Sequence, residues 1–348
     1  MKIKKAFIYK VFRAIYLEFK NFPQVLKFIF AGKNSVCITS WIFTEKGQVS
    51  HHNWGDDINK FFFEYITGKT IVNVPLCKLV KYVSKTRILA IGSLLSYQTN
   101  KHTIIWGSGL QYNEQARPLT SSPKKILAVR GPLSRKWLLE QKIDCPEIFG
   151  DPALLLPMFY KPKKLFSKKI GIIPHMNELL EKNEILMKFL ENKNTVLIKT
   201  SDYKNWQDFI DKIFSCDFII SSSLHGIIVS EAYCVPNVWV EFKEHPKDWN
   251  FKFHDFYFSV GKFNEKKISL TKDISLEDLL IEKTKWQKGY FNPEPLLNVC
   301  PFREDIFAHT GIKTIPDNFV YKNTTQVTGG GNKQIRFLFE RPSLREAA

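Results

Sequence analysis

Several familiar signatures are missing from the sequence. Its six cysteines are scattered, with no C-x-x-C pair and no regular spacing, which favours reduced thiols in a cytosol over a disulfide framework or a zinc site. It has neither a G-x-G-x-x-G motif nor a P-loop, which argues against an enzyme that binds NAD or ATP. It also has no RRM, KH, helix-turn-helix or zinc-finger pattern. We therefore expect no nucleic-acid partner.

Acidic residues are also scarce. The 348 residues include 34 Asp and Glu against 51 Lys and Arg, a formal charge of +17. Without nucleic acid, that charge points to an anionic membrane surface or to small polyanionic substrates. An apolar fraction of 44% with 14% aromatics excludes general disorder. The length exceeds what one compact core usually holds, so we expect two domains.

The N-terminal segment is basic and amphipathic. Residues 1–33 carry eight Lys or Arg and one Glu, a local net charge of +7, and their apolar residues fall roughly on one helical face. Such a helix lies in the plane of a bilayer interface, and its apolar runs are far shorter than the ~20 residues that a crossing requires. It lacks the h-region and cleavage site of a signal peptide. The alternative is a helix packed on the protein's own core.

The rest of the chain alternates apolar, strand-like runs with helical segments. The predicted strands are 35–42, 70–75, 87–95, 103–110 and 125–131, followed by 170–176, 194–200, 216–223 and 237–242. Two such series predict an α/β fold of two Rossmann-like, doubly wound domains that face a central cleft. The predicted domains are a basic helical segment 1–34, a first Rossmann-like domain 35–160, a second one 161–322 with a helical C-terminal region, and a flexible tail 323–348.

The most informative stretch is "SSSLHG", where a buried strand turns into a helix. A helix N-terminus presents free N–H groups and positive partial charge, so it attracts anions. Ser221–Ser223 add hydroxyl donors, and His225 adds a proton that titrates near neutral pH. The helix end lowers the pKa of His225 and a bound dianion restores it, which suits a general acid. The alternative is a buried histidine bonded to backbone.

Other strand ends carry polar residues with two possible roles. Arg130 follows a strand and precedes Gly-Pro, a position suited to bidentate binding of carboxylate or phosphate, or else to an ion pair. Asp56 is either a helix cap or a site carboxylate. His51, His52, Asp56 and Asp57 resemble metal ligands, but adjacent pairs rarely point at one ion, so we predict no metal. Trp249 either stacks on a sugar ring or packs a helix across the groove.

The order and spacing of these motifs resemble one known family. "NWGDDIN", "AIGSLL", "WGSGL", "VRGPLSR", "GDPALLLP", "GIIPHM" and "SSSLHGIIVSEAYCVPNVWV", followed by "FKFHDFYFSVG", are similar to the bacterial polysaccharide pyruvyl transferases over roughly residues 35–262. The resemblance implies a GT-B-like fold, with an acceptor side in the first domain and a donor side in the second. It also implies transfer of a pyruvyl group from phosphoenolpyruvate to two sugar hydroxyls as a cyclic ketal, with release of phosphate and no cofactor.

The resemblance further implies a role in the synthesis of capsule, exopolysaccharide or cell-wall polymer, often on lipid-linked acceptors. We therefore expect a cytoplasmic enzyme that contacts the inner membrane through residues 1–30. Two alternatives stay open: a GT-B glycosyltransferase that uses a nucleotide sugar, and a noncatalytic polysaccharide-assembly subunit. Many family members carry an arginine directly before Leu-His, where this chain has Ser223. Arg130, Lys199, Lys243 or backbone N–H groups would then hold the donor.

Residue types, positions and resemblance together give one set of predicted site residues. His225 is the predicted acid and Asp56 the predicted base or acceptor-orienting carboxylate, with Asp151 as its alternative. The predicted donor-binding residues are Arg130, Ser221, Ser222, Ser223, Gly226 and His175. The predicted acceptor-binding residues are Asn53, Gly107, Ser108 and Trp249.

Overall fold

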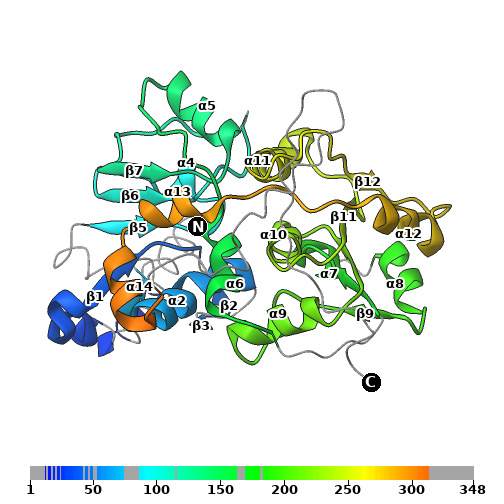
Figure 1. Cartoon of the computed structure of the whole chain (residues 1–348), viewed down its shortest axis with the longest axis horizontal. Helices are drawn as coiled ribbons and strands as arrows, with labels where there is room; N and C mark the ends of the chain where they lie inside the picture. The colour runs from blue at the N-terminus through cyan, green and yellow to red at the C-terminus, as the bar shows by residue number, and fades with distance from the viewer. Residues whose placement is uncertain are drawn as a thin grey trace, which may run out of the picture.

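Two parallel sheets form the framework of the molecule. The computed structural model describes residues 25–41, 53–73, 86–113, 116–162, 169–180 and 183–312, with a few further positions between residues 12 and 49. Each sheet has five strands, all parallel to their neighbours. Figure 1 shows them as two lobes side by side, each with helices around its sheet. The prediction of two Rossmann-like α/β domains is confirmed.

The N-terminal lobe is built on short apolar strands, as expected where helices cover a parallel sheet. In sheet order the strands are β4 (Thr70–Asn73), β1 (Ser35–Ile38), β5 (Arg87–Leu89), β6 (Thr103–Trp106) and β7 (Lys125–Ala128). Its helices are α2 (Trp54–Thr67), α4 (Leu95–Gln98) and α5 (Pro132–Glu140), and β2 (Thr44–Glu45) pairs with β3 (Gln48–Val49). Each strand is shorter than predicted; after β1, β5, β6 and β7, the Gly or Ser residues that were predicted at the carboxyl end lie outside the strand.

The C-terminal lobe repeats this plan. In sheet order its strands are β12 (Ile268–Ser269), β11 (Asn237–Glu241), β10 (Phe218–Ser221), β8 (Ile170–Ile173) and β9 (Thr195–Leu197). Its helical elements are α7 (Met176–Leu180), α8 (Glu184–Leu190), α9 (Trp206–Phe214), α10 (Leu224–Ala232), η3 (Lys247–Asn250), α11 (Phe251–Ser259) and α12 (Leu276–Lys285). The edge strand β12 was not predicted, because two residues in a polar segment give no strand signal.

The two sheets share one strand order. In each, the second strand of the series lies at one edge, the first lies beside it, and the third, fourth and fifth follow on the other side. The chain therefore changes direction between β1 and β5 in one lobe, and between β8 and β10 in the other. In open α/β sheets, ligands bind outside the carboxyl ends of the strands at such switch points.

The lobes are packed tightly against each other through helix α2. Trp54 is fully buried, and its ring lies 4.8 Å from that of Phe209 in the other lobe. Its backbone N–H donates to the carbonyl of Thr200 at 2.8 Å, and its indole N–H donates to the carbonyl of Trp206 at 2.8 Å. The first turn of α2 is thus fixed to the C-terminal lobe, which sets the position of the residues that follow Trp54.

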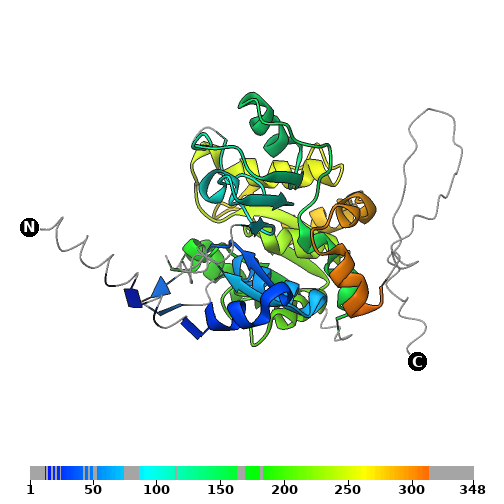
Figure 2. The same cartoon turned by 90° about the vertical axis from the view of Figure 1, so that its left-hand side faces the viewer.

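The chain crosses between the lobes more than once. The short elements η2 (Pro152–Leu155) and α6 (Leu156–Phe159) precede the C-terminal lobe, and η1 (Gly32–Asn34) precedes β1. Helices α13 (Pro293–Asn298) and α14 (Arg303–Thr310) return to the N-terminal lobe (Figures 1 and 2), where the Trp106 indole donates to the Leu296 carbonyl at 2.9 Å. The predicted tail, 323–348, lies outside the described residues, and the predicted domain boundaries stay predictions.

The N-terminal segment is helical at each position that the structure describes between residues 12 and 31. Val25 and Phe28 are buried and pack with Cys37 and Val72 of the first sheet. Phe12, Phe19 and Phe30 are instead 68%, 82% and 84% exposed. No helix in the described part of the chain combines the length and apolar character that a bilayer crossing demands.

Candidate active site

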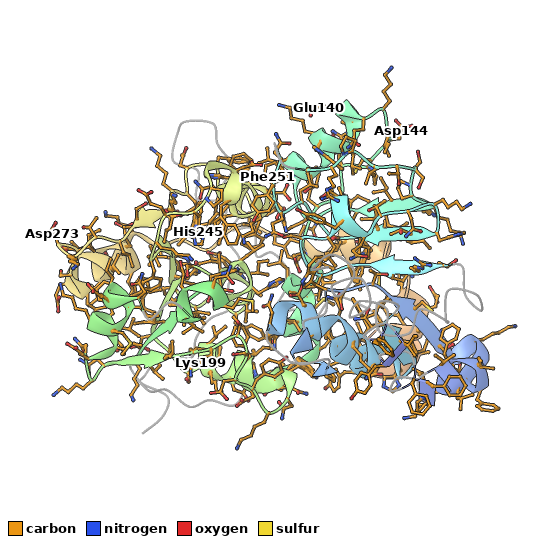
Figure 3. All side chains as sticks on the ribbon, turned by 180° about the vertical axis from the view of Figure 1, so that it is seen from behind. Glu140, Asp144, Lys199, His245, Phe251 and Asp273 are labelled. Atoms are coloured by element: carbon orange, nitrogen blue, oxygen red, sulfur yellow. The ribbon has the colours of Figure 1, made fainter. Side chains whose placement is uncertain are left out.

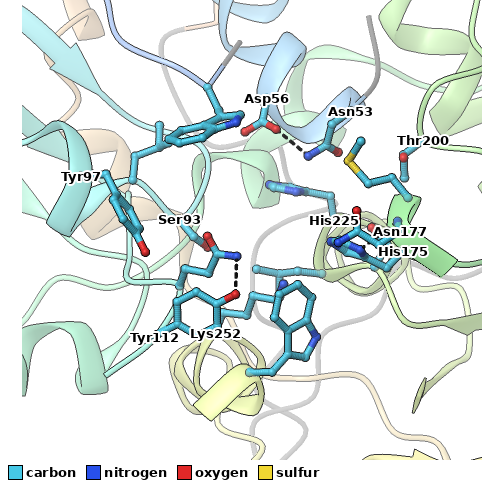
Figure 4. A pocket seen from close by; sticks show the side chains of 17 residues that line it. Asn53, Asp56, Ser93, Tyr97, Tyr112, His175, Asn177, Thr200, His225 and Lys252 are labelled. Carbon is cyan, nitrogen blue, oxygen red and sulfur yellow. Dashed lines mark hydrogen bonds between the residues drawn. The ribbon is translucent and has the colours of Figure 1, made fainter. Parts of the chain in front are cut away.

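A cavity of about 300 Å³ lies between the lobes, at the carboxyl ends of both sheets. Its lining comes from both lobes (Figure 4). The lining residues are Trp41, Asn53, Asp56, Ser93, Leu94, Tyr97, Gln111, Tyr112, His175, Met176, Asn177, Thr200, Ser223, Leu224, His225, Trp249 and Lys252. A pocket of this size fits a small ligand or part of a larger one.

The two switch points supply most of this lining. Trp41, Asn53 and Asp56 follow β1, and Ser93 and Leu94 follow β5. Their counterparts in the other lobe follow β8 and β10. These counterparts are His175, Met176 and Asn177 after β8, and Ser223, Leu224 and His225 after β10. The fold therefore brings four strand-end loops around one cavity, as the predicted central cleft requires.

His225 occupies the first turn of α10 and faces the cavity. Its side chain is 7% exposed, and its Nε2 atom has no hydrogen-bond partner among the described residues. Burial, together with the smaller effects of the positive charges of Arg130 and Lys252, lowers the pKa of His225 to about 3. The direction agrees with the prediction, although burial is the largest cause. The imidazole is therefore neutral in the empty pocket, with one nitrogen free to exchange a proton.

Gly55 explains why the "NWGDD" and "SLHG" motifs occur together. A Cβ atom at residue 55 would lie 2.0 Å from Nδ1 of His225, closer than any real contact. The ring also packs edge-on to Trp54, with centroids 6.4 Å apart. The start of α2 in one lobe is thus shaped to hold the histidine of the other lobe.

Asp56 enters the cavity from the same turn of α2. Its Oδ2 atom accepts a hydrogen bond of 2.6 Å from the Asn53 side-chain amide. Burial raises the pKa of Asp56 to about 7, and the negative charge of Asp57 adds to the rise. A carboxyl group that titrates near neutral pH can act as a base toward a hydroxyl. Asn53 caps no backbone N–H of α2 with its side chain; it holds Asp56 instead.

Lys252, on α11, is a site residue that the sequence did not single out. It is 6% exposed, lines the cavity, and places Nζ 3.4 Å from the ring centroid of Trp249. Burial lowers the pKa of Lys252 to about 7, with Arg130 adding to the fall. The available signal was one lysine within the aromatic run "WNFKFHDF", three residues after Trp249 and so on the same side of a helix.

His175 and Trp249 line the cavity beside Lys252, and buried Glu178 supports both of them. The His245 ring stacks on Trp249 at 4.5 Å, and its Nε2 lies 3.3 Å from the buried carboxylate of Glu178. Glu178 also accepts a hydrogen bond of 2.9 Å from the backbone N–H of His175. Because His245 and Lys252 cover the Trp249 ring, the packing interpretation of Trp249 is favoured over sugar stacking. Burial lowers the pKa of His175 to about 3.

Of the three serines before α10, only Ser223 lines the cavity. The Ser221 hydroxyl donates to the Ile173 carbonyl at 3.1 Å and accepts from the Ser223 N–H at 3.0 Å. The Ser222 hydroxyl donates to Glu178. A Cβ at Gly226 would lie 2.4 Å from the Ser221 oxygen. Ser221, Ser222 and Gly226 therefore shape the turn, and a direct role in donor binding stays a prediction.

Arg130 lies behind the cavity wall. Its guanidinium group is fully buried, pairs with Asp255 of α11, and donates to the Ser93 hydroxyl at 2.6 Å. Of the two interpretations, the ion pair is the one that the geometry shows, although it is a buried pair and not a surface one. Its charge still acts on His225 and Lys252 through space.

Three further predicted residues are buried outside the lining. Asp151 accepts a hydrogen bond of 3.0 Å from the Ala153 N–H as the cap of η2, and burial raises its pKa to about 6. Gly107 has φ +92°, and a Cβ there would lie 2.3 Å from Pro152. The Ser108 hydroxyl donates to the Gly92 carbonyl at 2.9 Å. A catalytic role for Asp151 and acceptor binding by Gly107 and Ser108 stay predictions.

The described residues include no group of three or more His, Cys, Asp or Glu side chains arranged to hold a metal ion. His51 and His52 lie outside the described residues.

Comparison with known proteins identifies the family of the chain. A model of the polysaccharide pyruvyl transferase family matches residues 66–244, just over half of the chain. The chain belongs to this family. The match includes α10 and His225, whereas Asp56 and Lys252 lie outside it. The family resemblance seen in the sequence motifs is confirmed.

Two relatives extend the comparison. The chain is 30% identical over 239 residues to uncharacterized protein L143 of Acanthamoeba polyphaga mimivirus, covering 65% of this chain and 78% of that protein. It is 23% identical over 230 residues to the succinoglycan biosynthesis protein ExoV of Rhizobium meliloti (strain 1021), covering 62% of this chain and 63% of ExoV. One of these two relatives is thus a protein named for succinoglycan biosynthesis.

Proposed function

We propose that the protein transfers the pyruvyl group of phosphoenolpyruvate to two hydroxyls of a sugar in a polysaccharide or its precursor, forming a cyclic ketal. Family membership and the relation to a succinoglycan biosynthesis protein support the reaction class. The observation that carries the proposal is Nε2 of His225, at the first turn of α10 in the interlobe cavity, for which the described part of the chain offers no hydrogen-bond partner.

The reaction needs one acid, one base and an anion site. A proton adds to the methylene carbon of the enol phosphate, and the first sugar hydroxyl attacks the resulting oxocarbenium-like carbon. The C–O bond to phosphate then breaks, and the second hydroxyl closes the ring. One hydroxyl proton replaces the proton given to the methylene carbon, and the other leaves with phosphate.

The cavity residues fit these roles. The first N–H groups of α10 attract the donor anion. His225 is neutral without an anion beside it. The negative charge of the donor raises the pKa of His225, so the imidazole takes up a proton and can transfer it to the methylene carbon. Asp56, with a pKa of about 7, accepts the proton of the attacking hydroxyl. Asn53 orients that carboxylate.

The test is phosphate release from phosphoenolpyruvate with galactosyl, glucosyl and N-acetylmannosaminyl acceptors. We expect release with at least one acceptor, and mass spectrometry should find the pyruvyl increment on the product. His225→Ala should lower kcat about 100-fold or more, the usual contribution of a general acid. Wild-type turnover by this variant at saturating phosphoenolpyruvate would remove the assignment.

Two other functions make different predictions in the same assays. A GT-B glycosyltransferase that uses a nucleotide sugar should bind UDP or CMP and gain thermal stability from it. A noncatalytic assembly subunit should release no phosphate with any acceptor. The cavity favours the pyruvyl transferase, because it places a proton donor and a base together where a small anion fits.

We further propose that the N-terminal helix holds the enzyme on the cytoplasmic face of the inner membrane, near a lipid-linked acceptor. The exposed side chains of Phe12 and Phe19 and the net charge of +7 over residues 1–33 support an anionic bilayer as the partner. Phe12→Ser/Phe19→Ser, which leaves the buried Val25 and Phe28 in place, should release the protein from anionic vesicles. If the double variant and the wild type sediment equally with those vesicles, this proposal is wrong.

A further inference from the structure

Lys252 is a buried lysine for which the described residues provide no counterion. Its side chain is 6% exposed. Among the described residues no carboxylate pairs with it and no group accepts a hydrogen bond from Nζ, and Asp56 and Glu178 act on it only through space. Taking an ammonium group out of water costs several kcal/mol when no partner repays it. A charge kept in this position indicates a partner that arrives from outside.

The position of Nζ limits what that partner can be. Nζ lies over the Trp249 ring and opens to the cavity (Figure 4). Among the cavity-lining residues that the structure describes, Lys252 is the one Lys or Arg. Arg130 is sealed behind the wall by Asp255, and Lys199, labelled in Figure 3, is exposed outside the lining. Within the described part of the chain, an anion in this cavity therefore meets a Lys or Arg side chain only at Lys252.

The protonation of Lys252 and that of His225 would respond to the same anion in the cavity. The charge of Lys252 is one of the causes that keep His225 unprotonated. A negative group placed between them neutralises this repulsion and favours the protonated form of both side chains. In Figure 4 the His225 ring lies between the Asp56–Asn53 pair and Lys252. An anion placed between the two side chains would bridge the N-terminus of α10 and the first turn of α11.

We propose that Lys252 is the donor-binding cation of this pocket and pairs with the phosphate or the carboxylate of the anionic substrate. Only the identity of that substrate rests on the proposed function. The assignment answers the question raised by Ser223, because the positive charge absent just before Leu-His comes instead from α11. Neither Lys199 nor Lys243 lines the cavity.

The experiment compares Lys252→Met, Lys252→Arg and the control Lys199→Met with the wild-type enzyme. Isothermal titration measures the binding of phosphoenolpyruvate, inorganic phosphate and pyruvate to each. Lys252→Met should weaken phosphoenolpyruvate binding about 10- to 100-fold, the range expected for one charge-assisted bond. Lys252→Arg should recover part of the affinity, and Lys199→Met should bind as the wild type does. Equal affinity in Lys252→Met and wild type would overturn the proposal.

The two partial ligands identify the group that Lys252 holds. If it pairs with phosphate, Lys252→Met should weaken the binding of inorganic phosphate and leave that of pyruvate unchanged. If it pairs with the carboxylate, the pattern should reverse. No loss with either partial ligand, together with none for phosphoenolpyruvate, contradicts both forms of the proposal.

Two further measurements separate binding from a purely structural role. Without ligand, Lys252→Met should melt at a higher temperature than the wild type, because an unpaired buried charge is gone. Proton uptake on binding at pH 7.5 should be smaller in Lys252→Arg, whose guanidinium is already charged. Asp56, Arg130, Glu178, His175 and His225 surround Lys252 and are unchanged in that comparison. Lower stability of Lys252→Met with unchanged affinity would assign the lysine to the fold.

Failure of the Lys252 assignment can be distinguished from failure of the proposed function. Lysine-dependent anion binding without phosphate release in the wild type would keep Lys252 as an anion site and remove the pyruvyl transfer. Phosphate release with an unchanged KM for phosphoenolpyruvate in Lys252→Met would keep the reaction and remove the role of Lys252.

Discussion

Helix α11 carries two buried charged residues, one turn apart, in opposite circumstances. Asp255 is fully buried and accepts hydrogen bonds from the Ser134 N–H at 2.8 Å, the Ser134 hydroxyl at 2.6 Å and Arg130 Nε at 3.1 Å. Lys252 has the ring of Trp249 beside it and no described acidic partner. Asp255, Ser134 and Arg130 form what we call the closed cluster. Lys252 and Trp249 form the open cluster, which lines the cavity.

The glycines around the closed cluster show how completely it is filled. A Cβ at Gly131 would lie 1.8 Å from the Asp255 carbonyl oxygen, and one at Gly109 would lie 2.6 Å from the Arg130 guanidinium. No ligand can enter such a cluster. It ties α11 to α5 and to the end of β7, which fixes the helix that presents Lys252. A satisfied buried charge is thus part of the framework, whereas an unsatisfied one at a cavity wall marks a binding site.

The largest effect is expected from opening the closed cluster. Asp255→Ala leaves Arg130 buried without a partner, so we expect the free energy of unfolding to fall by about 3–5 kcal/mol. Urea denaturation measures it. The double variant Arg130→Met/Asp255→Leu, which removes both charges, should recover much of the loss.

A partly exposed ion pair provides the matched control. Asp305→Ala breaks the 2.8 Å contact with Lys69, and surface pairs of this kind contribute about 1 kcal/mol or less. If Asp255→Ala lowers the free energy of unfolding no more than Asp305→Ala does, the contrast between a structural and a ligand-binding charge on α11 is lost.

A second test concerns Asp56, the carboxylate that lines the cavity together with Lys252. Its pKa is raised from 3.8 to about 7 by burial. Below pH 4 the group is protonated in the folded and unfolded states, and between pH 4 and 7 only the folded state keeps the proton. Native stability is therefore lost over this window, by up to about 4 kcal/mol at 1.36 kcal/mol per pKa unit.

Asp56→Asn has no proton to lose. Thermal unfolding from pH 4 to 8 should show its stability advantage over the wild type growing up to pH 7 and then levelling off, while turnover falls. Asp278→Asn is the control, because Asp278 is exposed and hydrogen bonds to Ser275 lower its pKa. A constant difference between Asp56→Asn and wild type across the range would show that Asp56 is already ionised at pH 4.

Sequence reasoning located the cavity better than it identified the charges around it. Strand-end motifs depend on local pattern, and the predicted residues that line the cavity are Asn53, Asp56, His175, Ser223, His225 and Trp249. The partner of Arg130 lies 125 residues away, and no local pattern reveals such a contact. Lys252 was hidden among aromatic residues, because whether a lysine there reaches water or a cavity depends on how α11 packs between the lobes.

Two glycine substitutions, one beside His225 and one far from the cavity, give the last and smallest test. Gly55→Ala places a Cβ where His225 Nδ1 lies, so the ring must move by an ångström or more. A misplacement of that size costs about 100-fold in kcat, or about 2.7 kcal/mol. Gly311→Ala is the control: residue 311 has φ +72° with no atom within 4 Å of the added Cβ, so it strains the backbone far from the cavity. Steady-state kinetics with melting curves should show lost turnover in Gly55→Ala and lost stability alone in Gly311→Ala. Full turnover in Gly55→Ala would mean that the cavity does not depend on the position of the His225 ring.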